Sequence, residues 1–249
     1  FQQSLAGESG LSLAHYSEML TQRGFGLAVR HSLEVSIVSA VVATLLAFLL
    51  AYTVHYTNAP GKYKKFIRLA AQLPMLLPTI TYGFAIIYSF GKQGLLTRLF
   101  GRQLFDIYGF NGLVIGYVIY TLPVSFMLLS NTMEYIDKKF TVVSRIMGDS
   151  PLKTFQQTII RPLLGTFATS FVQCFFLCFT DYGIPESVGG EYEVVATVLY
   201  NEMLGSIPNF NNGAVVAVIM LIPSIVSILL LKFLERYNIR YTKISAIEL

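Results

Sequence analysis

Apolar residues in this 249-residue chain gather into five blocks, separated by polar segments that hold most of the charged side chains. The blocks cover residues 33–56, 66–90, 112–133, 164–181 and 213–234. Each is close to the ~20 residues that a helix needs to cross ~30 Å of hydrocarbon. Because lipid offers the backbone no hydrogen-bond partners, such segments must be helices. The pattern predicts an all-α, polytopic membrane protein with five transmembrane helices in a single domain over residues 1–249.

The composition agrees with this pattern. Hydrophobic residues make up 54% of the chain and charged residues 13%, whereas soluble domains carry about 25% charge. The net charge of +4 does not indicate a nucleic-acid partner, because the basic residues lie in short segments beside the apolar blocks. We therefore expect a lipid bilayer around the chain and no nucleic acid among its partners.

The basic residues also predict the orientation of the helices. Thirteen of the 18 lysines and arginines lie on one side of the predicted membrane, in the segments after the first, third and fifth blocks. The positive-inside rule makes that side cytoplasmic. In the cell membrane, the C-terminus is then cytoplasmic and residues 1–28 form an extracytoplasmic N-terminal segment. A segment that starts outside without a signal peptide suggests an upstream helix, so six or more helices are expected in the natural protein.

One cytoplasmic segment, residues 134–163, is long for a connection between membrane helices, which usually takes about 2–8 residues. Ser150 and Pro151 form a helix-start signal, because Ser caps free amides and Pro fits the first helical position. Gly148 precedes them, where a chain reversal can require positive φ. The segment therefore predicts a helix, a glycine turn and a second short helix before the chain re-enters the membrane.

The second short helix is predicted to be amphipathic. Leu152, Phe155 and Ile159 recur at helical spacing on one face. A helix of this kind, parallel to the membrane, suits docking into a groove on another protein. A surface helix that rests on lipid headgroups is the alternative, and the pattern alone leaves it open.

This segment resembles the cytoplasmic loop of binding-protein-dependent importer permeases, which have the type I fold of ABC transporters. The signature of that family reads Glu-Ala-Ala, three residues, Gly, nine residues, then Ile-x-Leu-Pro. Anchored on Gly148, the chain matches it at the glycine, at the Ser150-Pro151 step and at the aromatic Phe155. The resemblance implies that residues 134–163 are a cytoplasmic coupling loop.

The loop departs from that signature at two positions. The Glu of the family falls on Val142, and its Pro falls on Arg161, one residue before Pro162. An ion pair made by that Glu is therefore not expected here, whereas the docking helix is.

The resemblance also implies partners. These are a cytoplasmic ATPase dimer, a second permease subunit that is the same or homologous, and an extracytoplasmic solute-binding protein. The chain is then a non-catalytic subunit that binds no cofactor, while ATP and Mg²⁺ are held by the partner ATPase subunits. The residues expected to couple to the ATPase are Gly148, Asp149, Ser150, Pro151, Leu152, Lys153, Thr154, Phe155 and Ile159.

A second resemblance concerns the fourth block and the loop after it. The run from Phe179 to Pro185, with Gly189-Gly190 and Tyr200 beyond it, is similar to permeases for 2-aminoethylphosphonate, ferric iron and polyamines. The continuation from Phe210 is closest to the phosphonate branch. The resemblance implies 2-aminoethylphosphonate or a related solute first, then ferric iron or a polyamine.

A translocation path is predicted in the second block and at the end of the fourth. Prolines in a membrane helix free backbone carbonyls and usually face protein or water, and a carboxylate at this depth is often functional. Helix packing for the second block, and a cap on the turn at Gly183 for the carboxylate, remain alternatives. The residues of the predicted path or gate are Gln72, Pro78, Thr79, Thr81, Tyr82, Asp181 and Tyr182.

Other classes of protein fit less well. No Gly-x-x-x-x-Gly-Lys-Ser/Thr motif occurs, and no nucleophile, metal cluster or acid-base pair is apparent in the helices. Cys174 and Cys178 lie four apart in one apolar block, so packing is predicted and no metal site. The three histidines are scattered and are predicted to be structural. A secondary transporter or channel would need no docking loop, and it often has charges inside its helices.

Overall fold

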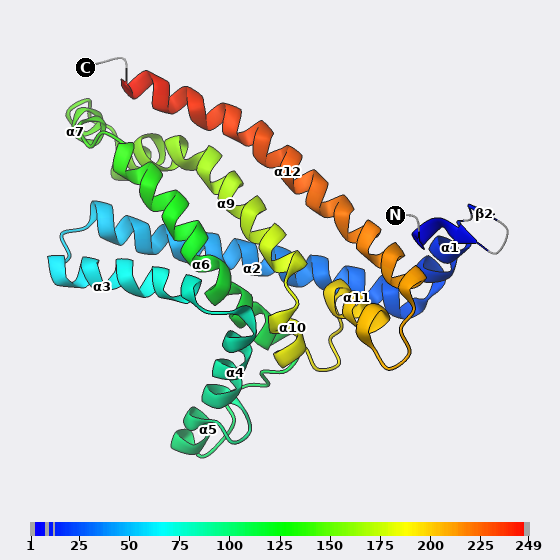
Figure 1. Cartoon of the computed structure of the whole chain (residues 1–249). Helices are drawn as coiled ribbons and strands as arrows, with labels where there is room; N and C mark the ends of the chain where they lie inside the picture. Colours follow the sequence, from blue (N-terminus) through cyan, green and yellow to red (C-terminus); the bar gives the residue numbers. More distant parts are fainter. Residues whose placement is uncertain (1–2, 8–9, 12, 247–249) are drawn as a thin grey trace. The chain divides into compact units, whose positions relative to one another are not determined.

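The computed structural model describes residues 3–7, 10, 11 and 13–246, and most of them are helical (Figure 1). Two short strands, β1 (Ala6–Gly7) and β2 (Gly10–Leu11), pair antiparallel. In this pair Ala6 lies opposite Leu11. The predicted all-α fold class is confirmed. The helices are η1 (Gln3–Leu5), α1 (Ala14–Thr21), α2 (Arg23–Tyr56), α3 (Gly61–Gln72), η2 (Leu73–Leu76), α4 (Thr79–Phe90), α5 (Leu95–Phe100), α6 (Phe110–Tyr135), α7 (Lys139–Ile146), α8 (Pro151–Phe155), η3 (Gln156–Ile160), α9 (Arg161–Thr180), α10 (Gly183–Val188), α11 (Val195–Leu204) and α12 (Phe210–Ala246).

Four continuous helical runs among the described residues are long and apolar enough to cross a membrane. They are Gly24–Tyr56, Phe110–Tyr135, Pro151–Thr180 and Phe210–Leu234. A fifth crossing is available if the bent pair Gly61–Leu76 and Thr79–Phe100 is taken as one span. The five predicted spans therefore correspond to four unbroken helices and one interrupted pair.

The predicted second span, residues 66–90, is not one helix, and this is a correction. A short 3₁₀ turn, η2, follows α3, and Pro78 then adopts an extended backbone with ψ 146° before α4 begins. Proline has no N–H and pushes the residue before it out of the helical region, so a helix usually stops there. Pro78 therefore separates α3 and η2 from α4.

The predicted fourth span, residues 164–181, begins earlier than expected. The helix starts at Pro151 and continues through α8, η3 and α9 without a break. Residues 156–160 form a π-helical turn, in which the Arg161 N–H donates to the Gln156 carbonyl five residues back. Pro162 follows directly and cannot donate a backbone hydrogen bond. The helix therefore continues through Arg161-Pro162 by means of a π turn, and no loop precedes α9.

The contacts divide the chain into two compact units that interleave along the sequence. Unit 1 comprises Phe1–Ser39, Leu77–Tyr120 and Phe175–Val226. Unit 2 comprises Ala40–Leu76, Thr121–Cys174 and Ser227–Leu249. Four helices are divided between the two units, with one part in each: α2, α6, α9 and α12.

Unit 2 has a core of small and large apolar side chains. Ala47 and Ala51 of α2 are fully buried, and they belong to one cluster with Phe126 and Leu129 of α6 and with Leu163 of α9. Alanine permits close approach of neighbouring helices, which is the usual packing device where lipid removes the hydrophobic driving force between them.

A buried polar cluster also joins these three helices in unit 2. The Ser170 hydroxyl of α9 lies 2.5 Å from Ser125 Oγ of α6 and 3.4 Å from Thr44 Oγ1 of α2. One turn later, the thiol of Cys174 donates to the Thr121 carbonyl at 3.8 Å. All five residues are buried. Hydroxyl bonds between membrane helices are worth about 0.6 kcal/mol each, so the cluster fixes the register of the helices more than it adds stability.

In unit 1, α10 lies directly against α4 because two glycines leave room. A Cβ at Gly83 of α4 would overlap the Ser187 side chain of α10. A Cβ at Gly183 would overlap the Thr79 hydroxyl and come within 2.7 Å of the Ile80 nitrogen. Both close contacts bring the start of α4 against α10.

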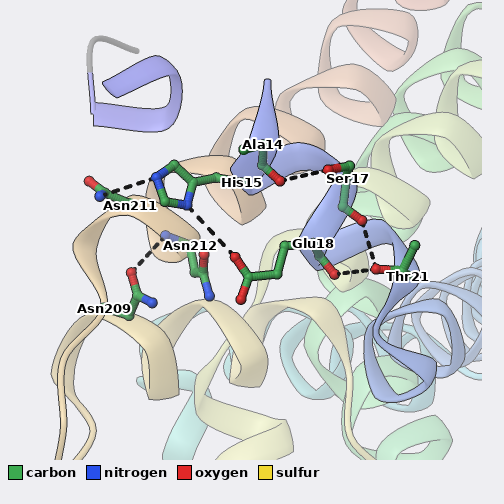
Figure 2. A network of polar contacts seen from close by, with 8 residues as sticks. All are labelled: Ala14, His15, Ser17, Glu18, Thr21, Asn209, Asn211 and Asn212. Carbon is green, nitrogen blue, oxygen red and sulfur yellow. Dashed lines mark hydrogen bonds and ion pairs between the residues drawn. The ribbon is translucent and has the colours of Figure 1, made fainter. Parts of the chain in front are cut away.

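The histidines have partners, which the sequence did not reveal. Figure 2 shows His15 of α1 between Glu18 and Asn211, at 3.9 Å and 3.5 Å. Asn209 in the same network caps the start of α12 by accepting from the Asn212 N–H at 3.1 Å. The His15–Asn211 contact ties α1 to the first turn of α12.

The other two histidines also join segments that are distant in sequence. His31 stacks on Tyr192 with ring centroids 3.8 Å apart, and its Nδ1 lies 3.0 Å from the Glu193 carbonyl oxygen. His55 Nε2 lies 2.8 Å from Ser130 Oγ. These contacts agree with the predicted structural role.

The glycine contact predicts a measurable loss of stability. Gly83→Ala should lower the free energy of unfolding by about 1–3 kcal/mol, because the added methyl group must displace Ser187. Gly26→Ala in α2 is the matched control, since no atom lies within 4 Å of its added Cβ. That control should be neutral or stabilising by up to ~1 kcal/mol. Thermal unfolding in detergent compares the two, and equal melting temperatures would contradict the packing.

Candidate functional site

The turn between α7 and α8 has the geometry expected of a helix end. Gly148 has φ +81°, and the N–H groups of Gly148 and Asp149 donate to the carbonyls of Arg145 and Ser144, each at 3.1 Å. These paired bonds form a Schellman motif, which satisfies the last carbonyls of a helix. The predicted positive φ at Gly148 is confirmed.

The start of α8 also follows the sequence signal. The Ser150 side chain accepts from the Lys153 N–H at 3.4 Å, and Pro151 occupies the first turn. Ser at the cap and Pro at the first position are both favoured because the first amides of a helix lack internal partners. The predicted helix start is therefore confirmed.

Four side chains lock this turn, and we call them the Asp149 clasp: Ser144, Asp149, Lys153 and Thr154. Ser144 Oγ donates to Asp149 Oδ2 at 2.8 Å and lies 3.0 Å from Thr154 Oγ1. Lys153 Nζ lies 2.5 Å from Asp149 Oδ1. The bonds from Lys153 and Ser144 lower the pKa of Asp149 and keep it ionised at neutral pH. The clasp makes α7, the turn and α8 one hydrogen-bonded body.

The apolar face of α8 does not point outward as predicted. Leu152 is exposed, but Phe155 packs on the rings of Phe48 and Tyr52, with centroids 6.4 and 5.7 Å away. Ile159 is buried in the core of unit 2. Each residue of a π turn advances less around the axis than in an α-helix, so Ile159 turns away from the face of Leu152. Phe155 and Ile159 anchor the helix to its own unit.

The side chains that do project are Ile146, Met147 and Leu152, which we call the apolar tip. Their exposed fractions are 81%, 79% and 76%. Ile146 and Met147 were not predicted as site residues, because their exposure depends on the turn that ends α7. Three large apolar side chains around one rigid turn are typical of a surface that docks a protein or a membrane.

Two open hollows lie beside the turn in unit 2. One of about 480 Å³ is lined in part by Phe140, Met147, Asp149 and Lys153. The other, of about 410 Å³, lies along the π turn. Neither contains a cluster suited to a metal, and the described residues hold no group of three or more His, Cys, Asp or Glu that could bind one.

The second predicted site centres on Asp181, at the end of α9 in unit 1. Its Oδ2 accepts from the Ile184 N–H at 2.9 Å, and the Thr79 hydroxyl and the Gly183 N–H also bond to the carboxylate. The carboxylate therefore caps α10, one of the two roles that the sequence left open. Capping by Asp satisfies amides that would otherwise be orphaned in an apolar environment.

Several tyrosines lie in the same unit as this carboxylate. Tyr82 and Tyr117 are buried in one apolar cluster, and Tyr120 and Tyr182 pack against it. The Tyr82 hydroxyl donates to the Leu77 carbonyl at 3.2 Å, which the break before Pro78 leaves without a helical partner. Tyr182 stacks on Tyr200 with centroids 4.3 Å apart.

The predicted path residues are only partly brought together. Thr79, Tyr82, Asp181 and Tyr182 lie in unit 1, and Pro78 and Thr81 form the start of α4 in the same unit. Gln72 is the last residue of α3 and belongs to unit 2. The role of these residues in transport stays a prediction.

Comparison with known proteins bears on both sites. The family model described as "Binding-protein-dependent transport system inner membrane component" matches residues 43–240. The chain belongs to this family. The match includes α7, α8 and the Asp149 clasp, as well as Asp181.

Curated relatives of this permease-family chain are longer than the chain itself. It is 26% identical over 196 residues to the putative ferric transport system permease protein FbpB 1 of Haemophilus influenzae, covering 76% of this chain and 31% of the relative. It is 26% identical over 216 residues to the ferric transport system permease protein FbpB of Actinobacillus pleuropneumoniae, covering 85% and 30%. The chain thus spans less than a third of either relative.

Solved structures share the fold at low identity. A bacterial ABC transporter that imports the acidic polysaccharide alginate has a chain with TM-score 0.72 and 11% identity, covering 96% of this chain and 87% of that one. The MetNI methionine ABC transporter has one with TM-score 0.62 and 14% identity, covering 94% and 99%. These likenesses place the permease-family chain in the fold of ABC transporter permeases.

The clasp lies between the two positions at which this family member departs from the signature, Val142 and Arg161. Val142, at the position of the family's Glu, is exposed and makes no ion pair. The Asp149–Lys153 pair has i, i+4 spacing and was visible in the sequence. The contact from Ser144 to Thr154 bridges two helices, so no spacing rule within one helix would have found it.

The clasp predicts the protease sensitivity of the loop. Asp149→Ala removes the Lys153 pair and the acceptor of Ser144, so the turn should open more often. We expect trypsin to cut at Arg145 and Lys153 roughly fivefold faster. Glu134→Ala, in the last turn of α6 and outside the clasp, should be cut at the unaltered rate. Equal rates for both variants would show that the clasp does not hold the turn.

Two substitutions of Asp181 distinguish its capping of α10 from a role of its charge in transport. Asp181→Asn keeps an oxygen acceptor for Ile184 and should keep the melting temperature, whereas Asp181→Ala should lose about 1 kcal/mol of stability. If the charge serves the translocation path, solute uptake falls in both variants. Full uptake in Asp181→Asn would leave the carboxylate with the capping role alone.

Proposed function

We propose that this chain forms the membrane core of a permease subunit in an ATP-driven importer. The observation that carries the proposal is the apolar tip, three exposed large side chains on a turn locked by the Asp149 clasp. A coupling element must be rigid, so that displacement at its tip moves the helix behind it. Membership of the binding-protein-dependent transport family supports this role.

The tip transmits motion through the helix that follows it. Ile146, Met147 and Leu152 dock on a cytoplasmic ATPase subunit, which binds ATP and Mg²⁺ and carries out hydrolysis. Because α8, η3 and α9 are continuous, a push on the tip reaches the membrane without crossing a loop. Phe155 and Ile159 clamp the helix to the core of unit 2 and so convert docking into movement of α9.

The remaining partners follow from the same role. A second permease subunit, identical or homologous, completes the path, and an extracytoplasmic binding protein delivers the solute. The chain itself has no catalytic part. Its C-terminus is cytoplasmic in the cell membrane, as the distribution of basic residues predicts.

The solute is proposed to be small and charged. The resemblance around Asp181 and Tyr200 favours 2-aminoethylphosphonate or a related compound, followed by ferric iron or a polyamine. Relatives of the chain carry ferric, sulfate and spermidine/putrescine transport in their names. Uptake by proteoliposomes with each candidate solute and its binding protein distinguishes these classes.

A secondary transporter or channel is the alternative function. It would need no ATPase and would leave the apolar tip without a partner. Purification of the native complex separates the two. An ATPase subunit should co-purify with the permease, and uptake should require ATP. Solute uptake by the permease without any ATPase subunit would overturn the proposal.

The apolar tip gives the decisive substitution. Met147→Ser with Leu152→Ser should reduce retention of the ATPase subunit roughly tenfold or more, because apolar anchors dominate docking energies. Melting temperature should hold, since both side chains are largely exposed. Ile207→Ser, a control at a 90% exposed residue of the loop before α12, should keep full retention. Unchanged retention in the double variant would contradict docking at the tip.

A further inference from the structure

Three aromatic residues form a column on the part of α2 that belongs to unit 2, and we call them the aromatic column: Phe48, Tyr52 and Tyr56. They are spaced four residues apart, so their side chains lie on one face of the helix. The ring centroids of Phe48 and Tyr52 are 6.0 Å apart, and those of Tyr52 and Tyr56 are 5.5 Å apart. Each ring therefore lies against the next, over about two turns of the helix.

The aromatic column packs against the helix that begins at Pro151. Phe155 of α8 contacts two of its rings edge-on, with centroids 6.4 Å from Phe48 and 5.7 Å from Tyr52. Phe167 of α9 lies 5.1 Å from Phe48. Tilted and edge-to-face pairs at these distances are favourable beyond the area that they bury. One continuous helix thus contacts the same face of α2 at two points, Phe155 and Phe167.

A further contact joins the column to the helix before the glycine turn. The ammonium group of Lys138 lies 5.7 Å from the centre of the Tyr56 ring, a distance at which a cation is attracted to the face of an aromatic ring. Lys138 directly precedes α7. Because the Asp149 clasp holds α7 and α8 together, the column meets this body on both sides of the turn, at Lys138 and at Phe155.

These contacts restrict movement between α2 and the helix of the loop. Sliding or rotation of α8 on α2 would separate Phe155 from its ring partners, and it would also disturb the pair of Phe48 and Phe167. A hydroxyl contact lies beyond the rings, since Thr44 Oγ1 of α2 is 3.4 Å from Ser170 Oγ of α9. Packed side chains that cannot rearrange freely carry displacement from one element to another.

We infer that the aromatic column couples α2 to the apolar tip, with Tyr52 as the positioning residue at its centre. The inference rests on the proposed function, in which an ATPase subunit displaces the tip. The helix of α9 follows the tip because it is continuous with α8, and α2 follows because its rings pack against Phe155 and Phe167. The helix α2 is itself a candidate span, and its other part belongs to unit 1. The column therefore carries the movement to a second span.

Distances between α2 and α9, measured by pulsed EPR, test the inference. Spin labels at Leu49→Cys in α2 and Leu164→Cys in α9 occupy exposed positions of unit 2. Cys174→Ser and Cys178→Ser remove the two native thiols and keep a hydrogen-bond donor at each position. In the purified complex of the full chain with its ATPase subunit, the distance should stay constant to about 1 Å when ATP, Mg²⁺ and vanadate are added.

Tyr52→Leu removes the central ring and keeps an apolar side chain. The distance between the labels should then shift by about 2 Å or more on addition of ATP, Mg²⁺ and vanadate, because α9 moves with the tip and α2 does not follow. Phe155→Leu, which removes the opposing ring, should show the same shift.

Two variants control the measurement. Tyr52→Phe keeps the ring and should keep the distance constant, which a loss of the hydroxyl group alone would not predict. Tyr63→Leu is the matched control, since Tyr63 is an exposed tyrosine of the same unit and has no ring contact in the described part of the chain. It should also leave the distance constant.

Two results would overturn the inference and leave the proposed function intact. A distance that changes with nucleotide in the parent protein would show that α2 does not follow α9. A constant distance in either ring-removing variant, with its ATPase subunit retained, would show that the rings are not the link. Failure of the parent protein to retain an ATPase subunit would overturn both, and the purification detects it before any distance is measured.

Discussion

A chain that crosses hydrocarbon has no water to satisfy its backbone, so every departure from the α-helix needs a local partner. The departures in this permease-family chain meet that requirement. Where Pro78 interrupts the chain, the Tyr82 hydroxyl bonds to the Leu77 carbonyl. Where α9 ends, Asp181 accepts from the amide of Ile184. At each of these two breaks, one side chain supplies a hydrogen bond to a backbone group.

The same constraint explains how far the sequence could be used. The Gly148 turn and the Ser150-Pro151 start depend on residues within one or two turns of each other, and these were predicted. The break at Pro78 replaces one predicted span by two elements, because the proline ends the helix there. The second element, α4, then packs on α10 through close contacts at Gly83 and Gly183. Local pattern could not show those contacts.

The segment from α7 to η3 shows the limit most clearly. Leu152, Phe155 and Ile159 have helical spacing, yet only Leu152 projects, because the π turn and the rings of Phe48 and Tyr52 draw the other two inward. The other two exposed side chains of the apolar tip, Ile146 and Met147, lie at the end of the preceding helix α7. Ser144 and Thr154 meet only because the glycine turn folds α7 back on α8. Each of these facts depends on the path of the chain between helices.

The π turn at residues 156–160 has a consequence for how such loops diverge. A π turn contains one residue more than the α-helical turn it replaces, but each of its residues advances less around the axis, so the two turns rotate the helix by about the same angle. Deletion of a single residue there would restore the α-helix and leave the projecting end at nearly the same angle to α9. The chain can therefore gain or lose one residue at this point while the apolar tip keeps its direction and the membrane span keeps its packing.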